Sequence, residues 1–129
     1  IPVVKGPDGR YGGAEAVVDK DASAALLASA IGAELLVIAT DVPGVFNDWG
    51  TPSARLIRRV SPDALGAQGF AAGSMAPKIE AACEFAKRSG HRAVIGALAQ
   101  IDGLIAGTAG TSIDCAYAEL VELADPGAF

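Results

Sequence analysis

The fold class is decided by residues 19–44, which read DKDASAALLASAIGAELLVIATDVPG. The aspartates at the start of this stretch can each cap a helix over residues 22–31, and Gly32 stands where a left-handed residue would end that helix. Residues 35–39 then form a continuous apolar run, which is typical of a parallel strand covered on both faces. A helix followed by such a strand predicts an α/β protein.

The same alternation continues toward the C-terminus. A second helix is predicted over residues 75–89, where apolar side chains fall on one stripe, and Gly90 ends it. The other predicted elements are a hairpin over residues 1–16, strands over 56–60, 92–96 and 111–113, a loop over 69–73, and helices from Pro62 and over 101–106. Together they predict a three-layer α/β/α sandwich with a mainly parallel sheet.

Composition excludes several classes of protein. The chain has 129 residues, of which 51% are hydrophobic, and its 15 acidic and 10 basic side chains give a formal net charge of −5. The acidic balance argues against a basic nucleic-acid groove or a patch for anionic membranes. No run approaches the roughly 20 apolar residues of a transmembrane helix. We therefore expect one domain with no nucleic-acid or membrane partner, located in the cytoplasm by default because no secretion signal is visible.

The cysteines and the histidine carry no metal-site pattern. Cys83 and Cys115 lie far apart, with no C-x-x-C and no His-rich context. Such a pair in an Ala-rich chain is typical of two buried reduced thiols, and a disulfide is the alternative. His91 is the only histidine and has no second candidate ligand nearby. No metal-binding residues are predicted.

Lys78 is the first candidate functional residue. It lies in the opening turn of its predicted helix, where the helix dipole is positive and disfavours a cation. Its helical neighbours Ser74, Ala81 and Ala82 offer no carboxylate to compensate. A glycine loop at Gly73, a helix N-terminus and a lysine together indicate an anion site, phosphate in particular. The alternative is a solvated lysine.

Two further polar groups follow apolar, strand-like segments. Asp19-Lys20-Asp21 comes directly after residues 16–18, and Thr40-Asp41 comes after residues 35–39. Open α/β sheets bind ligands at the carboxyl ends of their strands. An ammonium there could neutralise charge on a transferred phosphoryl group, with an aspartate fixing its orientation. The alternatives are a helix cap with an incidental ion pair and a Thr-Asp pair that only organises a turn. The sequence contains no P-loop, no G-x-G-x-x-G and no nucleophile elbow, so phosphoryl transfer without a P-loop is the sharper hypothesis.

In this order the segments resemble the amino acid kinase family, and most closely its carbamate kinase branch. The Gly-Ser-Met-x-Pro-Lys form is the most specific element. The matching motifs are Glu15-Ala16-Val17-Val18-Asp19-Lys20-Asp21, Thr40-Asp41-Val42-x-Gly44-Val45, Phe70-x-x-Gly73-Ser74-Met75-x-Pro77-Lys78, Arg92-Ala93-Val94-Ile95 and Gly110-Thr111-Ser112-Ile113. The resemblance covers residues 1–113, which we expect to be the nucleotide-binding half of such an enzyme, and leaves residues 114–129 as an unaligned C-terminal tail.

The resemblance implies Lys20 and Asp21 as catalytic residues: Lys20 would stabilise the migrating phosphoryl group and Asp21 would orient the lysines. Lys78 would contact the nucleotide phosphates. The residues implied at the nucleotide pocket are Thr40, Asp41, Val42, Gly73, Ser74 and Met75. The implied reaction is reversible phosphoryl transfer from ATP to carbamate, giving ADP and carbamoyl phosphate, with Mg²⁺ bridging phosphate oxygens.

The chain departs from the family at several points. Pro43 stands where the family usually has Asp, and Phe46 where it usually has Tyr. The N-terminal half, which supplies the glycine-rich phosphate grip and the carbamate pocket, has no counterpart. We therefore expect activity only with that half, from the same precursor or a partner chain, and self-association or a partner at an exposed edge. The alternatives are a non-catalytic nucleotide-binding or interaction module, and an amino acid kinase with another acceptor.

Overall fold

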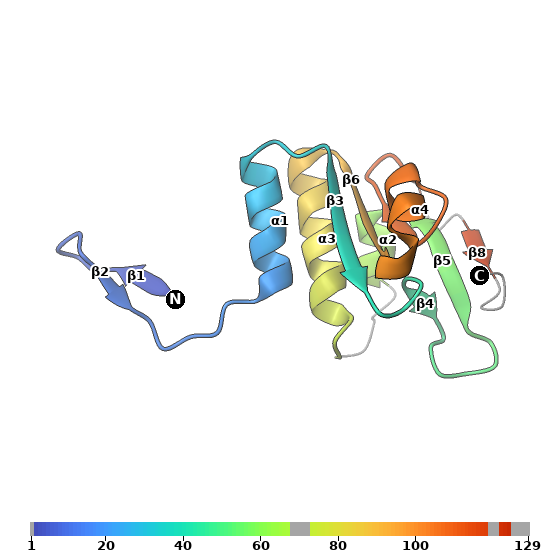
Figure 1. Ribbon diagram of the computed structural model, residues 1–129, viewed down its shortest axis with the longest axis horizontal. Helices are drawn as coiled ribbons and strands as arrows, with labels where there is room; N and C mark the ends of the chain where they lie inside the picture. Colours follow the sequence, from blue (N-terminus) through green and yellow to red (C-terminus); the bar gives the residue numbers. More distant parts are fainter. Residues whose placement is uncertain (1, 68–72, 119–121, 125–129) are drawn as a thin grey trace.

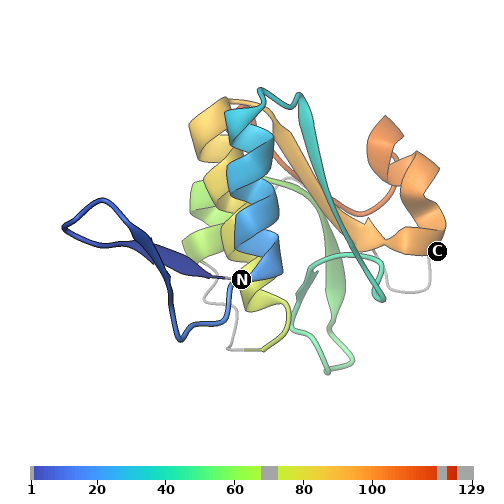
Figure 2. The same cartoon turned by 60° about the vertical axis from the view of Figure 1, so that its left-hand side comes forward.

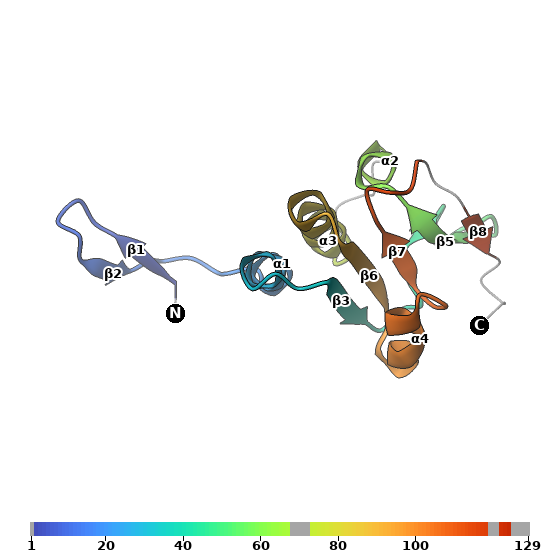
Figure 3. The same ribbon diagram turned by 90° about the horizontal axis from the view of Figure 1, so that it is seen from above.

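A computed structural model describes residues 2–67, 73–118 and 122–124, and in it helices pack on both faces of one sheet (Figure 1). The elements in chain order are β1 (Val3–Lys5), β2 (Tyr11–Gly13), α1 (Lys20–Ala30), β3 (Leu35–Thr40), β4 (Phe46–Asn47), β5 (Arg55–Val60), α2 (Pro62–Ala67), α3 (Ala76–Ser89), β6 (Arg92–Ala97), a 3₁₀ turn (Leu98–Gln100), α4 (Ile101–Ala106), β7 (Thr111–Ile113) and β8 (Glu122–Ala124). Seen from above in Figure 3, α1, α3 and α2 lie along one face of the sheet and α4 lies on the other. The predicted three-layer α/β arrangement is confirmed.

The sheet is mixed. Its strand order is β3-β6-β7-β5-β4, with β8 beside β5. The pairs β3–β6 and β5–β7 are parallel, whereas β6–β7, β4–β5 and β5–β8 are antiparallel. The expectation of a mainly parallel sheet therefore holds for β3–β6 and β5–β7 and not for the other three pairs. The end of α4 lies near the start of β6, because the Arg92 side chain donates to the carbonyls of Leu104 and Ile105. β7 nevertheless begins opposite Ile95 and runs antiparallel to β6.

The predicted helix signals are confirmed. Asp19 is the residue that caps α1, because its carboxylate accepts a hydrogen bond of 2.7 Å from the backbone N–H of Ala22. Gly32 and Gly90, each with φ of 70°, follow α1 and α3 in the left-handed conformation that a side chain would disfavour. These residues fix where α1 begins and where both helices end.

The main core lies between the sheet and the helices α1, α2 and α3. Its largest fully buried side chains include Phe85, Leu65, Ile57 and Ile113. A smaller cluster of buried apolar residues lies under α4 on the other face. Within the described residues, no helix is both long enough and apolar enough to cross a membrane.

Several segments differ from the sequence-based expectations or extend them. The N-terminal hairpin forms as predicted and stands apart from the layered body (Figures 1 and 2). Strands β4 and β8 were not predicted, and β8 adds residues 122–124 of the presumed tail to the sheet. The loop predicted over residues 69–73 lies mostly outside the described residues. Cys115 is exposed, so the prediction of two buried thiols is wrong for this residue, which follows the last strand of the body on the surface.

The segment that follows β3 is anchored through Thr111. The Thr111 hydroxyl donates to the carbonyl of Ile57 at 2.6 Å and accepts from the backbone N–H of Val45 at 2.8 Å. Packing around it is tight: a Cβ on Gly44 would lie 2.7 Å from Thr111 Oγ1 and 2.8 Å from the side chain of Leu56. The turn after β3 is therefore held against the interior strands by one fully buried hydroxyl.

We predict that Thr111→Val lowers the free energy of unfolding by about 2–4 kcal/mol, because the isosteric side chain leaves two buried backbone groups unpaired. Thr111→Ser, the matched control, keeps the hydroxyl and loses one buried methyl, at a cost of about 1 kcal/mol. Urea unfolding at neutral pH measures both variants. A Thr111→Val chain no less stable than Thr111→Ser would show that the hydroxyl does not anchor the segment.

Candidate functional site

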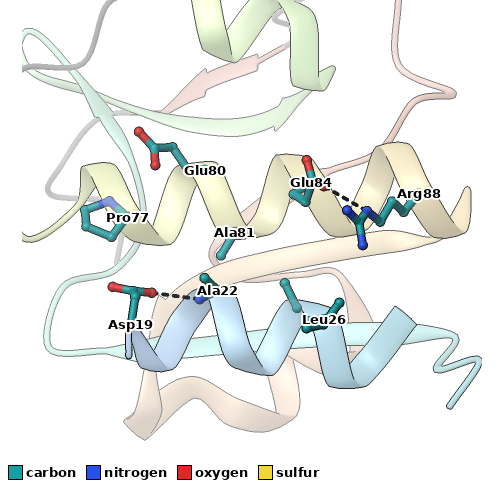
Figure 4. Close-up of a pocket in the computed structure, with 9 residues that line it drawn as sticks. Asp19, Ala22, Leu26, Pro77, Glu80, Ala81, Glu84 and Arg88 are labelled. Atoms are coloured by element: carbon teal, nitrogen blue, oxygen red, sulfur yellow. Dashed lines mark hydrogen bonds and ion pairs between the residues drawn. The ribbon is translucent and has the colours of Figure 1, made fainter. Parts of the chain in front are cut away.

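The first turns of α1 and α3 lie side by side at one end of the domain. Both helices begin at the end where β3 and β6 finish, as Figure 1 shows, and Figure 4 views the same two helices in parallel. α3 has no side-chain cap at Met75 and carries Pro77 in its first turn. Each helix N-terminus bears unpaired backbone N–H groups and a partial positive charge. This end of the domain is therefore electropositive before any side chain is counted.

The side chains of Lys20, Asp21 and Lys78 meet at these two helix ends. Asp21 Oδ2 accepts a hydrogen bond of 3.1 Å from Lys20 Nζ and one of 3.0 Å from Lys78 Nζ. The side chains of Asp21 and Lys78 are 11% and 12% exposed, whereas that of Lys20 is 79% exposed. The carboxylate absent from the helix of Lys78 thus comes from a different helix, 57 residues earlier in the chain.

Charge in this triad is net positive. Burial raises the pKa of the Asp21 carboxyl, but the hydrogen bonds from Lys78 and Lys20 outweigh burial and hold the pKa below its ordinary value. The hydrogen bond to Asp21 raises the pKa of Lys20. At neutral pH two ammonium groups therefore share one carboxylate at two helix N-termini. An arrangement of this kind can bind an anion such as phosphate.

The other predicted residues lie at the same end, without direct contact with the triad. Thr40 pairs with Ala97 at the finish of β3 and β6, and its hydroxyl donates to Asp41 Oδ1 at 3.2 Å. Gly73 and Ser74 are exposed just before α3, and Met75 packs against the core. Among the described residues, no hydrogen bond or ion pair links Thr40, Asp41, Val42, Gly73, Ser74 or Met75 to Lys20, Asp21 or Lys78. Phe70 of the sequence motif lies outside the described residues.

Trp49 is a candidate residue that the sequence reasoning missed. Strand β4 runs antiparallel to β5 and hence in the direction of β3, so the turn after β4 emerges at the same end of the sheet. Trp49 is 66% exposed there, with its ring 5.0 Å from the ring of Phe46 and tilted by 53°. Asp48 before it has a φ of 51°, which is uncommon for a residue with a side chain. The available signal was a lone tryptophan between turn residues.

A groove of about 510 Å³ runs between α1 and α3 (Figure 4). It begins at Asp19 and Pro77, and small side chains such as Ala22 and Ala81 face it. Glu84 and Arg88 pair at 2.8 Å at its other end. None of the three triad residues lines the groove, so it is a neighbour of the electropositive site and not the site itself.

The described residues hold no group of three or more metal-ligating side chains. Asp21 is the carboxylate between the two lysines, and both contact the same oxygen. The residues that the structure describes therefore do not by themselves form a Mg²⁺ site, which in nucleotide enzymes is built largely from phosphate oxygens and water.

The sequence profile of the amino acid kinase family matches residues 1–97. The chain belongs to the amino acid kinase family. It is 52% identical over 101 residues to the carbamate kinase of Haemophilus influenzae, covering 78% of this chain and 33% of that protein. It is 47% identical over 118 residues to the carbamate kinase of Rhizobium meliloti, covering 89% and 36%. This chain thus spans about a third of the length of these curated relatives.

A solved member of the amino acid kinase family supports the same assignment. The carbamate kinase of Giardia lamblia bound to AMP-PNP superposes with a TM-score of 0.83 at 32% identity, over 88% of this chain and 41% of that one. The family and the fold predicted from the motifs are therefore confirmed.

We predict that Asp21→Asn lowers the free energy of unfolding at pH 7 by about 1–3 kcal/mol, because Lys78 is left without its buried partner. The pKa of Asp21 is lower in the folded chain, so its contribution is full above the unfolded pKa of about 4 and is lost as the pH falls through the folded value. The variant should therefore lose less stability than the original chain between pH 5 and pH 3. Urea unfolding across this range measures the difference.

Asp63→Asn is the matched control for this prediction. Asp63 pairs with Lys87 at 2.8 Å, but the two side chains are 89% and 52% exposed. Its removal should therefore change the free energy of unfolding by less than about 1 kcal/mol. Equal losses in the two variants would contradict the importance given to the buried pair.

Proposed function

We propose that this chain supplies the ATP-binding part of a carbamate kinase-like phosphotransferase. The reaction is reversible transfer of the γ-phosphoryl group of ATP to carbamate, giving ADP and carbamoyl phosphate. In this proposal activity needs the remainder of such an enzyme, from the same precursor or from a partner chain, since this chain spans about a third of the length of its curated relatives. The proposal is supported by family membership and by the carbamate kinases of Haemophilus influenzae and Rhizobium meliloti among its relatives.

The observation that carries the proposal is the Lys20–Asp21–Lys78 triad at two helix N-termini. Phosphoryl transfer is catalysed mainly by positioning and by neutralising charge on phosphate oxygens. Asp21, kept ionised by its neighbours, holds both ammonium groups toward one point. Lys78 is largely buried and gives a fixed charge for the nucleotide phosphates, whereas Lys20 is exposed and can follow the group that moves. Asp21 is a positioning residue in this scheme.

The nucleotide pocket is proposed at the same end of the sheet. Thr40, Asp41 and Val42 follow β3 there, and Gly73, Ser74 and Met75 lead into α3. Trp49 offers an exposed flat ring that suits contact with a nucleobase. Mg²⁺ would arrive with the nucleotide, carried by its phosphate oxygens. The Giardia lamblia carbamate kinase bound to AMP-PNP is a relative with a nucleotide analogue bound.

A second candidate is a non-catalytic nucleotide-binding or interaction module with the same fold. Pro43 and Phe46 favour it, because they replace the carboxylate and the hydroxyl that are usual in this loop. Phe46 is buried against Ala54 and Leu56, so it contributes to packing and offers no polar group. A third candidate is another amino acid kinase whose acceptor differs from carbamate, since the acceptor pocket is expected outside this chain.

We predict that Lys78→Ala weakens ADP binding about 10- to 100-fold, because a charge-assisted hydrogen bond to phosphate is lost. Lys20→Ala should leave ADP affinity within a few-fold and lower the turnover of the complete protein about 10²- to 10³-fold, as expected for loss of charge stabilisation in the transition state. Calorimetric titration with ADP measures binding, and ATP-dependent formation of carbamoyl phosphate measures turnover. Lys87→Ala, which removes an exposed lysine of α3, is the control for charge alone.

The outcomes separate the candidate functions. ADP binding without carbamoyl phosphate formation by the complete protein supports the non-catalytic module, and phosphorylation of a different carboxylate supports another acceptor. No ADP binding and no thermal stabilisation by ADP would contradict any nucleotide role. Equal changes in ADP affinity and turnover in the Lys20, Lys78 and Lys87 variants would contradict the separate roles proposed for Lys20 and Lys78.

We also propose that this chain associates with itself or with a partner chain through α1 and β3. Leu26 and Leu27 of α1 are 60% and 62% exposed, and Ile31, which directly follows α1, is 70% exposed. β3 ends the strand order and pairs with β6 alone among the described strands. An apolar helix face beside an unpaired strand edge favours association.

We predict that the sedimentation coefficient of the chain rises with concentration. Leu27→Lys combined with Ile31→Lys should suppress the rise, because charge on both exposed positions opposes apolar contact. Val17→Lys, at a position 98% exposed and outside α1, is the control. A monomer at every concentration would count against the proposed association.

A further inference from the structure

A second group of reactive side chains lies at the other end of the sheet from Lys20 and Lys78. Strands β5 and β7 run opposite to β3 and β6, so their carboxyl ends emerge at the opposite end. Pro62 follows β5 there, and Cys115 follows β7. In Figure 3 the chain directly after β7 passes toward α2 and α3. The proposed nucleotide chemistry uses none of these residues.

Contacts to neighbouring carbonyls place Cys83 and Cys115 in one cluster. Cys83 lies in α3 and its thiol donates to the carbonyl of Pro62 at 3.8 Å. The thiol of Cys115 donates to the carbonyl of Ala86 at 3.4 Å. Ala86 lies three residues after Cys83 and so on the same side of α3. The Cys83 thiol belongs to this part of α3, and the Cys115 thiol, from the segment after β7, contacts the same part.

The sheet register supports the same placement. Val60 of β5 pairs with Ile113 of β7 in parallel. Pro62 and Cys115 each come two residues later, so the carbonyl that Cys83 contacts belongs to the first residue of α2, at the same end of the sheet as Cys115. The backbone N–H of Asp114 donates to the carbonyl of Val60 at 3.3 Å, which ties the start of this segment to β5.

The two thiols differ in reactivity. Both are free, Cys115 exposed and Cys83 half-buried. Burial raises the pKa of Cys83 to about 11, and the ammonium of Lys87 on α3 opposes this rise. The carboxylate of Asp63 on α2, which pairs with Lys87, and the Cys115 thiol itself add to the rise. An exposed thiol that reacts first and a buried neighbour that reacts second are the two parts of a disulfide-forming pair.

We propose that Cys115 and Cys83 are a redox-active dithiol that reacts with a low-molecular-weight disulfide and closes an internal disulfide bond. The Cys115 thiolate attacks one sulfur of RSSR, forming a mixed disulfide and releasing one thiolate that takes up a proton. Cys83 then gives its proton to solvent and attacks the Cys115 sulfur, releasing the second RS⁻. Two protein thiols are oxidised while one RSSR is reduced to two RSH.

The bond would join α3 to the segment after β7. α3 is also the helix that carries Lys78 in its first turn. Oxidation at the middle of this helix would thus restrain the element that presents a cation in its first turn. The dithiol itself is independent of the proposed phosphotransfer and can be tested without it.

The test exposes the reduced chain to excess oxidised glutathione and follows quenched samples by intact mass and peptide mapping. We expect a glutathione adduct at Cys115 first, and then a Cys83–Cys115 disulfide as glutathione leaves. The second step should accelerate about tenfold per pH unit between pH 7 and pH 10, because the thiolate fraction of Cys83 rises in that proportion below its pKa of about 11.

Variants keep the proposal falsifiable. Cys83→Ser should stop at the glutathione adduct on Cys115. Cys83→Ala should give the same result, and it serves as a second variant in case the serine hydroxyl alters packing. Cys115→Ser should stay unmodified at neutral pH, because the remaining thiol is mostly protonated. The proposal is overturned if the unsubstituted chain keeps the adduct as Cys83→Ser does. It is equally overturned if non-reducing electrophoresis shows bonds between chains and none within them.

Discussion

The arrangement of the candidate site depends on one carboxylate, Asp21 Oδ2, held between two ammonium groups. Without it, Lys20 and Lys78 would stand in the first turns of neighbouring helices, where the helix dipoles and their mutual repulsion oppose them. The carboxylate offsets both effects and leaves a net positive charge. It also joins α1 to α3 at the end where the candidate residues lie. The same contact therefore holds the two helices together and positions the two ammonium groups.

Small side chains let α1 and α3 come close enough for this contact. Ala25 and Ala28 of α1 and Ala81 and Ala82 of α3 are buried between the helices and the sheet. Alanine permits close helix packing with little loss of side-chain entropy. The Ala-rich composition that distinguishes the sequence is thus a condition for bringing Lys78 to Asp21. Larger residues at these positions would separate the two first turns.

Local features of the fold were predictable from the sequence, and long-range ones mostly were not. Asp19, Gly32 and Gly90 act on the backbone within a few residues, so their patterns gave the helix ends to within two residues. The direction of β7 shows only in its pairing with β5 and β6 across the sheet, which no local pattern encodes. The contact of Lys78 with Asp21 joins positions 57 residues apart. The motifs associated these residues through family resemblance, and only the structure shows the contact.

Because the sheet is mixed, carboxyl ends of its strands emerge at both ends of the sheet. A fully parallel sheet presents all its strand carboxyl ends on one side, and that side carries the chemistry while the other serves stability. Here β3–β6 and β5–β7 point in opposite directions. Each end of the sheet therefore receives two loops that follow parallel strands, and each can acquire polar or reactive side chains without disturbing the other. Distance from Lys20 and Lys78 is therefore not enough to expect a substitution to be neutral, because both ends of this sheet can carry polar or reactive side chains.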